Sequence, residues 1–224
     1  MPRRFHLPAI PRSLGSRGIV FFAGFSMMTI ELLAARVTAP YLGSSLYTWT
    51  GIIAFVLLGI AVGAFVGGKL ADRRPPRHAS DGAWPRRVLA ISLLAAGALT
   101  AVGYGVAALI GPWLGARLSV PAAMPLFALC VFFPPSVFLA AVQPAAIKTD
   151  LAELAETGRV VGLLGSWNAA GSILGTYLAG FVFNYYLSTR LVWLSIAVAL
   201  FAAGGWTLFR KPSASARRTP SAAV

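Results

Sequence analysis

The sequence is poor in charged residues, cysteine and histidine, and these shortages exclude several classes of protein. Only 11% of the 224 residues are charged, against about 25% in an average soluble domain, so there is too little polar surface to cover a soluble globule. The single cysteine, Cys130, has no partner for a disulfide within the chain. It stands in an apolar run and is expected to be a small buried hydrophobic residue.

Motifs of catalysis and cofactor binding are also missing. The chain has no glycine-rich phosphate loop after a strand, no H-E-x-x-H, no nucleophile elbow and no cysteine pair. Both histidines, His6 and His78, lie in polar segments, and a single acid lies within an apolar run. We therefore predict that the protein is not an enzyme and that it binds no metal ion and no cofactor.

Long apolar stretches dominate the rest of the sequence. Hydrophobic residues make up 58% of it, and its mean hydropathy is +0.76. A helix needs about 20 largely apolar residues to cross about 30 Å of hydrocarbon. Six stretches meet this requirement and predict an all-α integral membrane protein with six transmembrane helices, at residues 18–40, 47–68, 88–110, 122–147, 160–187 and 191–209.

The positive charge is concentrated between these stretches. The formal net charge is +13, yet the lysines and arginines lie in short segments, which argues against a nucleic-acid-binding protein. All except Arg36, Arg117 and Arg190 fall in the N-terminal segment, the second and fourth connections or the C-terminal tail. By the positive-inside rule, this distribution predicts a multi-pass protein of a bacterial-type inner membrane with both termini in the cytoplasm.

The polar segments are predicted to lie on that cytoplasmic side. Residues 1–17 and 210–224 are expected to be disordered basic ends against the anionic leaflet, flanking a transmembrane domain at 18–209. Residues 73–87 are predicted to form a polar loop. Residues 150–156 are expected to form a short interfacial helix.

One acid, Glu31, lies inside a predicted span. It is about 20 Å from the cytoplasmic start of its helix and therefore near the middle of the membrane. A carboxylate at that depth is costly and usually faces a bundle interior or a water-filled cavity. We predict that Glu31 couples protons or balances the charge of a cationic substrate. The alternative is a protonated or paired carboxyl that joins two helices.

Further polar residues accompany Glu31 within the spans. Arg36 follows it by five residues, a rotation of about 140°, so the two side chains lie on different faces. Arg36 is expected either to reach the outer interface or to pair with another helix. We group it with Gln143, Trp167 and Asn168 as candidates for substrate binding or proton coupling. The two amides are more typical of interhelical hydrogen bonds, whereas Trp167 is a candidate for lining a cavity.

Prolines and tryptophans predict features of individual helices. Pro134, Pro135 and Pro144 predict a kinked fourth helix, and broken helices in transporters often line a binding cavity. Besides Trp167, four tryptophans lie near span ends or in outer loops, and most of these four are expected to anchor the helices at the membrane interface. They are Trp49, Trp113, Trp193 and Trp206.

Glycines recur at four-residue spacing on two predicted helices. The second span carries Gly59, Gly63 and Gly67, and the fifth carries Gly171 and Gly175. Such stripes let helix backbones approach closely. We interpret them as helix-packing surfaces, which could also slide during transport.

One short motif resembles a known transporter family. The segment G-A-F-V-G-G-K-L-A-D-R-R at 63–74 resembles the loop between helices two and three of the major facilitator superfamily. Gly68, Asp72 and Arg73 match its glycine, acid and base. The family's further basic residues are displaced here by the segment 75–85. The resemblance implies that this chain is one six-helix half of such a carrier.

A longer resemblance covers residues 21–183. The segments E-L-L-A-A-R-V-T-A-P-Y-L-G-S-S-L-Y-T-W at 31–49 and G-R-V-V-G-L-L-G-S-W-N-A-A-G-S-I-L-G-T-Y-L-A-G-F at 158–181 carry it. They resemble the membrane domain that is fused to spermidine-synthase-like proteins. In that group a soluble aminopropyltransferase domain follows the helices. No residues here match that domain, so its chemistry is not carried over.

Together these observations predict a homodimeric half-size transporter. Two copies with the same orientation would form a parallel dimer whose central cavity holds two Glu31 side chains. Proton coupling through this acid, with polyamines or related organic cations as substrates, is the expected function. The alternative is a membrane scaffold without transport activity that recruits a soluble spermidine-synthase-like enzyme to its basic cytoplasmic face.

Overall fold

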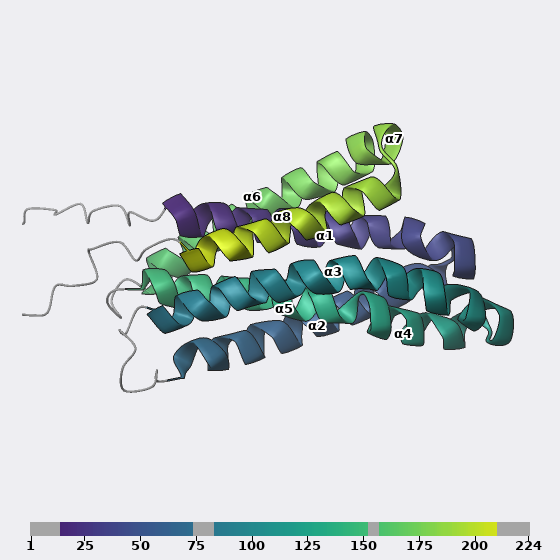
Figure 1. The fold of residues 1–224 in the computed structure, drawn as a ribbon, viewed down its shortest axis with the longest axis horizontal. Coiled ribbons are helices and arrows are strands. Elements are labelled where there is room, and N and C mark those ends of the chain that lie inside the picture. The colour runs from purple at the N-terminus through teal and green to yellow at the C-terminus, as the bar shows by residue number, and fades with distance from the viewer. Residues whose placement is uncertain (1–13, 74–82, 152–156, 210–224) are drawn as a thin grey trace, which may run out of the picture.

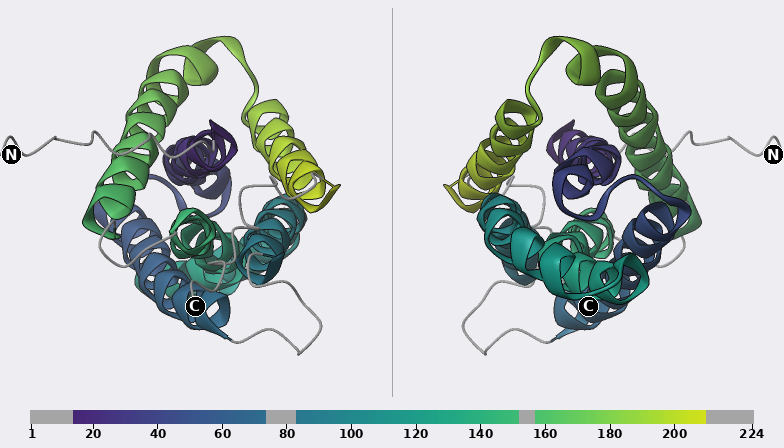
Figure 2. Two further views of the ribbon diagram at one scale, coloured as in Figure 1. Left: turned by 90° about the vertical axis from the view of Figure 1, so that its left-hand side faces the viewer. Right: turned by 90° about the vertical axis from the view of Figure 1, so that its right-hand side faces the viewer.

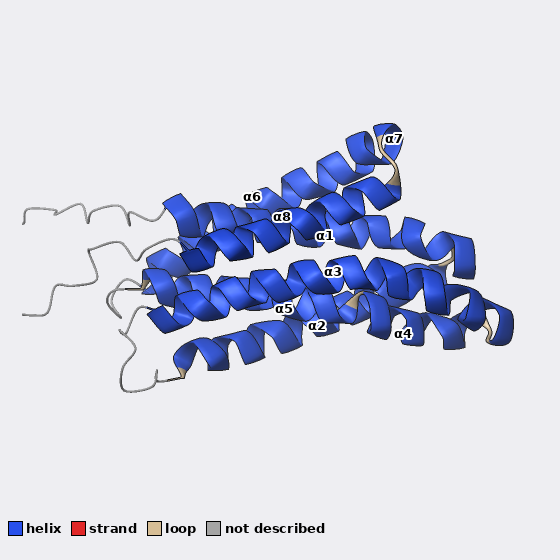
Figure 3. Ribbon diagram, viewed as in Figure 1, coloured by secondary structure: helices blue, strands red, loops and turns tan. Residues whose placement is uncertain are grey.

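The computed structural model describes residues 14–73, 83–151 and 157–209, and within these ranges every regular element is a helix (Figures 1 and 3). The all-α class predicted from the sequence is therefore confirmed for the described residues. The elements are α1 (Leu14–Leu42), α2 (Leu46–Asp72), α3 (Ala83–Arg117), α4 (Val120–Val131), α5 (Phe133–Asp150), α6 (Thr157–Tyr177), the π-helix η2 (Leu178–Phe183), α7 (Asn184–Tyr186) and α8 (Thr189–Phe209).

Several of these helices are long and apolar enough to cross a membrane. In the described ranges α1, α2, α3 and α8 each meet this condition, and the bent pair of α4 and α5 makes a fifth if it is one span. The chain is thus a multi-pass membrane protein with four or five candidate spans. The predicted span 160–187, which corresponds to α6, η2 and α7, is not among them. Its apolar residues are diluted by Ser166, Asn168 and Ser172, so the predicted number of six is not confirmed.

The fourth predicted helix is bent where its prolines occur. α4 and α5 meet at an angle of 47°. Pro134 and Pro135 occupy the first turn of α5, where a proline lacks no intrahelical hydrogen bond. The kink expected from these two residues is therefore confirmed. Pro144 lies inside α5, and the helix continues through it to Asp150.

The helix ends alternate between the two ends of the bundle. α1, α3 and α6 begin at the same end at which α2, α5 and α8 finish (Figure 1). The turns after α1, α3 and α7 lie at the opposite end. The first of these turns depends on Gly43, whose φ of 71° is a left-handed conformation that ends α1.

Some predicted boundaries are wrong by several residues. Residues 14–17, expected in the N-terminal tail, belong to α1, and residues 83–87, expected in the loop, open α3. Pro85 is tolerated there because it lies in the first turn of that helix. Asp150 ends α5 and is not part of a separate interfacial helix. The remaining parts of the two tails and of both connections lie outside the described residues.

The helices pack in pairs. α1 lies along α6, α2 along α5, and α3 along α8, while α3 also packs on α5 (Figure 2). Treating α4–α5 and α6–η2–α7 as single rods gives six rods in the described chain. The rods can be exchanged in order, α1 with α4–α5, α2 with α6–η2–α7, and α3 with α8. After this exchange the same three main pairs result. The weaker contacts do not all follow this exchange, since α3 packs broadly on α5 whereas α8 contacts α1 only slightly, and α1 contacts α3 more than α5 contacts α8.

The two glycine stripes lie at two of these paired interfaces. A Cβ atom at Gly59 would lie 2.7 Å from Ser136 Cβ, and one at Gly67 would lie 2.6 Å from Ala141 Cβ, both on α5. On α6, a Cβ at Gly171 or Gly175 would collide with the carbonyl of an α1 phenylalanine. Real side chains would not fit at these distances, so glycine is required for the observed spacing of the helices. The other member of the α2 stripe, Gly63, faces the carbonyl of Val137 in the same way.

Two predictions about single residues are wrong. Trp193 is no interface anchor, because it is fully buried and its Nε1 donates a hydrogen bond to the carbonyl oxygen of Thr100 at 2.7 Å. Its ring lies close to Phe132 and Tyr104 at the centre of the bundle. Cys130 is exposed and not buried, since α4 turns this residue away from the other helices. Whether a residue in an apolar run faces lipid or protein depends on the helix rotation.

Candidate functional site

Glu31 occupies a half-buried position on α1. None of the described residues donates a hydrogen bond to its carboxyl group or forms an ion pair with it. The helix-joining pair, which was the alternative interpretation of this residue, is therefore absent from the described chain. An acid in an apolar helix that contacts no polar protein group is expected to meet water or a ligand.

Two oxygen atoms of α6 approach the same face of α1. Gly24 precedes Glu31 by two helical turns, which places it on nearly the same face about 10 Å along the axis. A Cβ atom on Gly24 would lie 2.7 Å from Asn168 Oδ1 and 2.9 Å from Ser172 Oγ. The absence of a side chain at Gly24 therefore leaves the space that these polar atoms occupy. The face of α1 that carries Glu31 therefore also lies against polar atoms of α6 at Gly24.

An amide of α5 lies next to this region of α6. Gln143 Nε2 is 4.0 Å from the position that a Cβ on Gly165 would take, one turn before Asn168. Both Gln143 and Asn168 are half-buried, and neither side chain has a hydrogen-bond partner among the described residues. The predicted interhelical hydrogen bonds of these two amides are therefore wrong for that part of the chain. Their donors and acceptors remain free to bind a ligand or water.

The other two candidates lie apart from this group. The Trp167 side chain is 41% exposed, and its ring meets the edge of Phe21 at a centroid distance of 6.2 Å. Arg36 is exposed, and its Nη1 donates a hydrogen bond to the carbonyl oxygen of Asn184 at 3.1 Å. The exposed Arg36 side chain is compatible with the first expectation, a side chain that reaches the outer interface, whereas the buried pair with another helix is not observed among the described residues. A basic side chain that binds a carbonyl at the end of a helix stabilises that end.

The residues of the loop motif lie where α2 meets α5. Asp72 Oδ1 is 2.6 Å from Lys148 Nζ, and both side chains are about half exposed. Gly68 faces Pro144, with 3.9 Å between its Cβ position and the proline Cβ, while Arg73 is exposed. The ion pair therefore joins the end of α2 to the end of α5. The sequence alone did not reveal Lys148 as the partner, although both residues stand in the last turn of their helices.

Other polar contacts join helices at the same end of the bundle. Ser16 Oγ donates a hydrogen bond to Asp150 Oδ1 at 2.8 Å, which links α1 to α5. Trp84 Nε1 donates to the carbonyl oxygen of Leu70 at 2.8 Å and links α3 to α2. Together with the Asp72–Lys148 pair, these contacts hold the ends of four helices together. None of them was predicted from the sequence.

Comparisons with known proteins do not extend this description. No protein-family model matches the chain, no curated protein is similar to it, and no solved structure resembles it. Within the described ranges, no group of three or more His, Cys, Asp or Glu side chains could hold a metal ion. The resemblances to the major facilitator superfamily and to the spermidine-synthase-like proteins therefore stay predictions.

Proposed function

We propose that this chain is a six-span half-transporter with both termini in the cytoplasm, and that two copies form a carrier of polyamines or related organic cations. Proton coupling is assigned to Glu31. The observation that carries the proposal is the position of this acid, which is half-buried in an apolar helix with no partner among the described residues. Intramembrane acids of this kind mark substrate and proton pathways.

The pairing of the helices supports a carrier architecture. Each half of a major-facilitator-type transporter contains two inverted repeats of three helices. The main pairs of this chain are unchanged when its first three rods are exchanged with its last three, as such repeats require. The glycine stripes agree with this exchange, because α2 presents its stripe to α5, and α6 presents its stripe to α1.

The packing of α6 supports a sixth span. Composition alone does not select this helix, but its polar and small residues Asn168, Ser172 and Gly171 face α1. The residues that it exposes include Ile173 and Tyr177, which are compatible with a lipid environment. A helix whose polar side chains lie against protein can cross a bilayer with a lower mean hydropathy than an isolated one.

The open position of Glu31 supports a second copy. One hollow among the described residues runs along α8, and Glu31 does not line it. Because Glu31 is only half-buried, a single chain presents this acid partly at its surface. A carrier holds its substrate between two units, and a second copy in the same orientation would supply the other wall. Two facing carboxylates would then attract a polyvalent amine or share a proton.

Transport by proteoliposomes tests this proposal. Uptake of a radiolabelled polyamine under an imposed pH gradient is measured for the wild type and for Glu31→Gln. We expect the variant to lose gradient-driven uptake, because its amide carries no exchangeable charge. Glu31→Asp, which keeps a carboxylate, is the matched control and should keep part of the activity. Unchanged uptake by Glu31→Gln, in protein with wild-type thermal stability, would reject the assigned role.

The dimer is tested separately. Native mass spectrometry of the protein in nanodiscs should show two chains per particle. A monomer that still transports would contradict the half-transporter and leave the role of Glu31 standing.

The scaffold remains the second candidate, and the exposed bases at the end of the bundle where α1 begins favour it. Lys69, Arg73 and Arg87 are exposed there, and such a surface suits an acidic soluble partner. Co-purification of a spermidine-synthase-like enzyme, together with no transport of any organic cation, would favour the scaffold over the carrier.

A further inference from the structure

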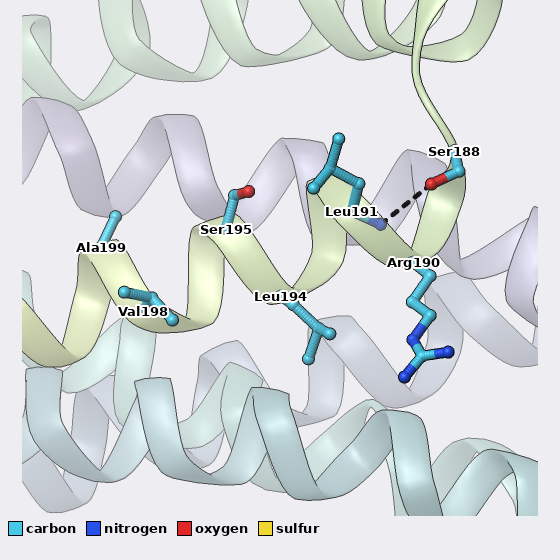
Figure 4. Close-up of a pocket in the computed structure, with 7 residues that line it drawn as sticks. All are labelled: Ser188, Arg190, Leu191, Leu194, Ser195, Val198 and Ala199. Atoms are coloured by element: carbon cyan, nitrogen blue, oxygen red, sulfur yellow. Dashed lines mark hydrogen bonds between the residues drawn. The ribbon is translucent and has the colours of Figure 1, made fainter.

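We propose that the exposed face of α8 binds an anionic phospholipid. α8 packs on α3 through residues such as Trp193, whose side chain is fully buried. Its other face carries an open hollow with a volume of about 600 Å³. Figure 4 shows the side chains that line it, all from α8 and the residue before it: Ser188, Arg190, Leu191, Leu194, Ser195, Val198 and Ala199.

One end of the hollow offers a cation and a hydroxyl group. Arg190 is exposed in the first turn of α8 and has no partner among the described residues. Ser188 Oγ accepts a hydrogen bond from the backbone N–H of Leu191 at 3.3 Å, so its own hydrogen is free to be donated. Figure 4 shows the Arg190 side chain and the Ser188 hydroxyl on different sides of the helix, so the guanidinium is the group that offers donors for the oxygens of a phosphodiester, and the hydroxyl is a separate polar group at the same end.

The other arginines at this end of the bundle are already engaged. Arg36 donates to the carbonyl oxygen of Asn184, and Arg117 lies over the ring of Trp113 at 5.1 Å. Among the described arginines of this end, Arg190 is therefore the one available to bind an anion from outside the chain.

The remainder of the hollow is apolar except for Ser195, and it has about the length of an acyl chain. Leu191, Leu194 and Val198 follow one another along the helix. The distance from Ser188 to Ala199 is about 16 Å at the rise of an α-helix. This is about half of the 30 Å hydrocarbon thickness, and therefore the depth of one leaflet. A phosphate bound at Arg190 would place its acyl chain along these side chains.

Charge favours a phospholipid over a second copy of the chain as the occupant. The described acids are Asp72 and Asp150 at the opposite end and Glu31 within α1. A second copy packed on this face would bring another Arg190 and no described carboxylate to balance it. An anionic headgroup supplies the missing charge. The proposal depends on insertion of the chain in a bilayer and not on transport.

Native mass spectrometry of the full-length protein in detergent tests the proposal. The probes are dioleoyl phosphatidylglycerol and dioleoyl phosphatidylcholine, which share their acyl chains and differ in net charge. We expect the anionic lipid to bind more tightly. Arg190→Ala should weaken its binding about tenfold, the factor expected for one lost charge-assisted hydrogen bond, whereas Arg117→Ala, the control at the same end, should not. Equal binding of the two lipids, or an unchanged affinity in Arg190→Ala, would overturn the proposal.

Two further variants separate the possible occupants. Ala199→Phe fills the apolar end of the hollow without altering Arg190, so it should weaken lipid binding if the acyl chain lies there; unchanged binding would contradict the placement of the chain. Ser195→Cys in a Cys130→Ala background should form no disulfide-linked dimer on oxidation in nanodiscs, because lipid and not a second copy covers this face. A disulfide-linked dimer would show that a second copy covers this face. Glu31→Gln should bind lipid normally, so failure of the transport proposal would leave this result intact.

Discussion

The closeness of α1 and α6 can be tested by one added methyl group. A Cβ atom on Gly171 would collide with the carbonyl oxygen of Phe21 and would lie 2.8 Å from its carbonyl carbon and 3.1 Å from its Cα. Ordinary contacts of a Cβ begin at 3.4 Å. The clashing atoms belong to a backbone and cannot rotate away, so Gly171→Ala has to push the two helices apart.

The expected cost is that of overpacking a tight interface. Inserting a methyl group into a well-packed core destabilises a protein by about 1–3 kcal/mol. Gly162 lies on the same helix, and a Cβ there would meet nothing within 4 Å. Gly162→Ala is therefore the matched control. It should be neutral or stabilising by up to about 1 kcal/mol, because alanine favours a helix more than glycine does.

A second substitution examines whether the stripe acts as a unit. Gly175 would meet the carbonyl of Phe25 on the same side of α1. Because Gly171→Ala already separates the two helices, Gly175→Ala then lowers the free energy of unfolding by less than it would alone. The double variant should therefore lose less stability than the sum of the two single variants, as coupled neighbours do.

Unfolding of the purified variants in mixed detergent micelles by increasing sodium dodecyl sulfate gives the free energies. The order expected is Gly162→Ala at or above wild type, followed by wild type and then Gly171→Ala. Equal stability of Gly171→Ala and Gly162→Ala would show that α1 and α6 do not approach as closely as described. The movement should also carry Asn168 away from Gly24, so the proposed transport activity, if measured, should fall in parallel with stability.

Two further predictions concern polar contacts between helices. A double-mutant cycle of Asp72→Asn and Lys148→Ala, measured by the same unfolding assay, should give a coupling of about 0–1 kcal/mol that falls with added salt, because both side chains are about half exposed; a larger, salt-independent coupling would contradict this. Trp193→Phe removes the hydrogen bond from the indole to the carbonyl of Thr100 and puts a smaller ring in a fully buried site. It should cost about 1–3 kcal/mol; unfolding and intrinsic fluorescence are the readouts, and wild-type stability would contradict the prediction.

The two ends of the bundle differ in how they are joined. Where α1 begins, the side chains of Ser16, Asp72 and Trp84 link neighbouring helices through polar contacts. At the opposite end, Arg36 links α1 to the end of η2. α6 and α8 are joined at this end through α7 and a short turn, and they diverge toward the end where α1 begins (Figure 2).

The class of the protein and the approximate positions of its helices follow from the sequence by itself. A bilayer requires every backbone polar group to be paired within the chain, so long apolar runs must become helices. The runs at 47–68 and 191–209 accordingly coincide with α2 and α8. The kink at Pro134 could also be predicted from the sequence, because the missing N–H of proline is a local property. The isolated acid at Glu31 needed no structure to be noticed, since its cost arises from the apolar residues around it.

The partners of these residues were decided by the tertiary structure. The spacing of Gly59 and Gly171 indicates close packing, but only the fold assigns the first to α5 and the second to α1. The carbonyl that Arg36 binds, the exposure of Cys130 and the free amide of Asn168 depend on how each helix is rotated about its axis. That rotation is fixed by contacts with helices far away in the chain, and a local sequence pattern does not contain them.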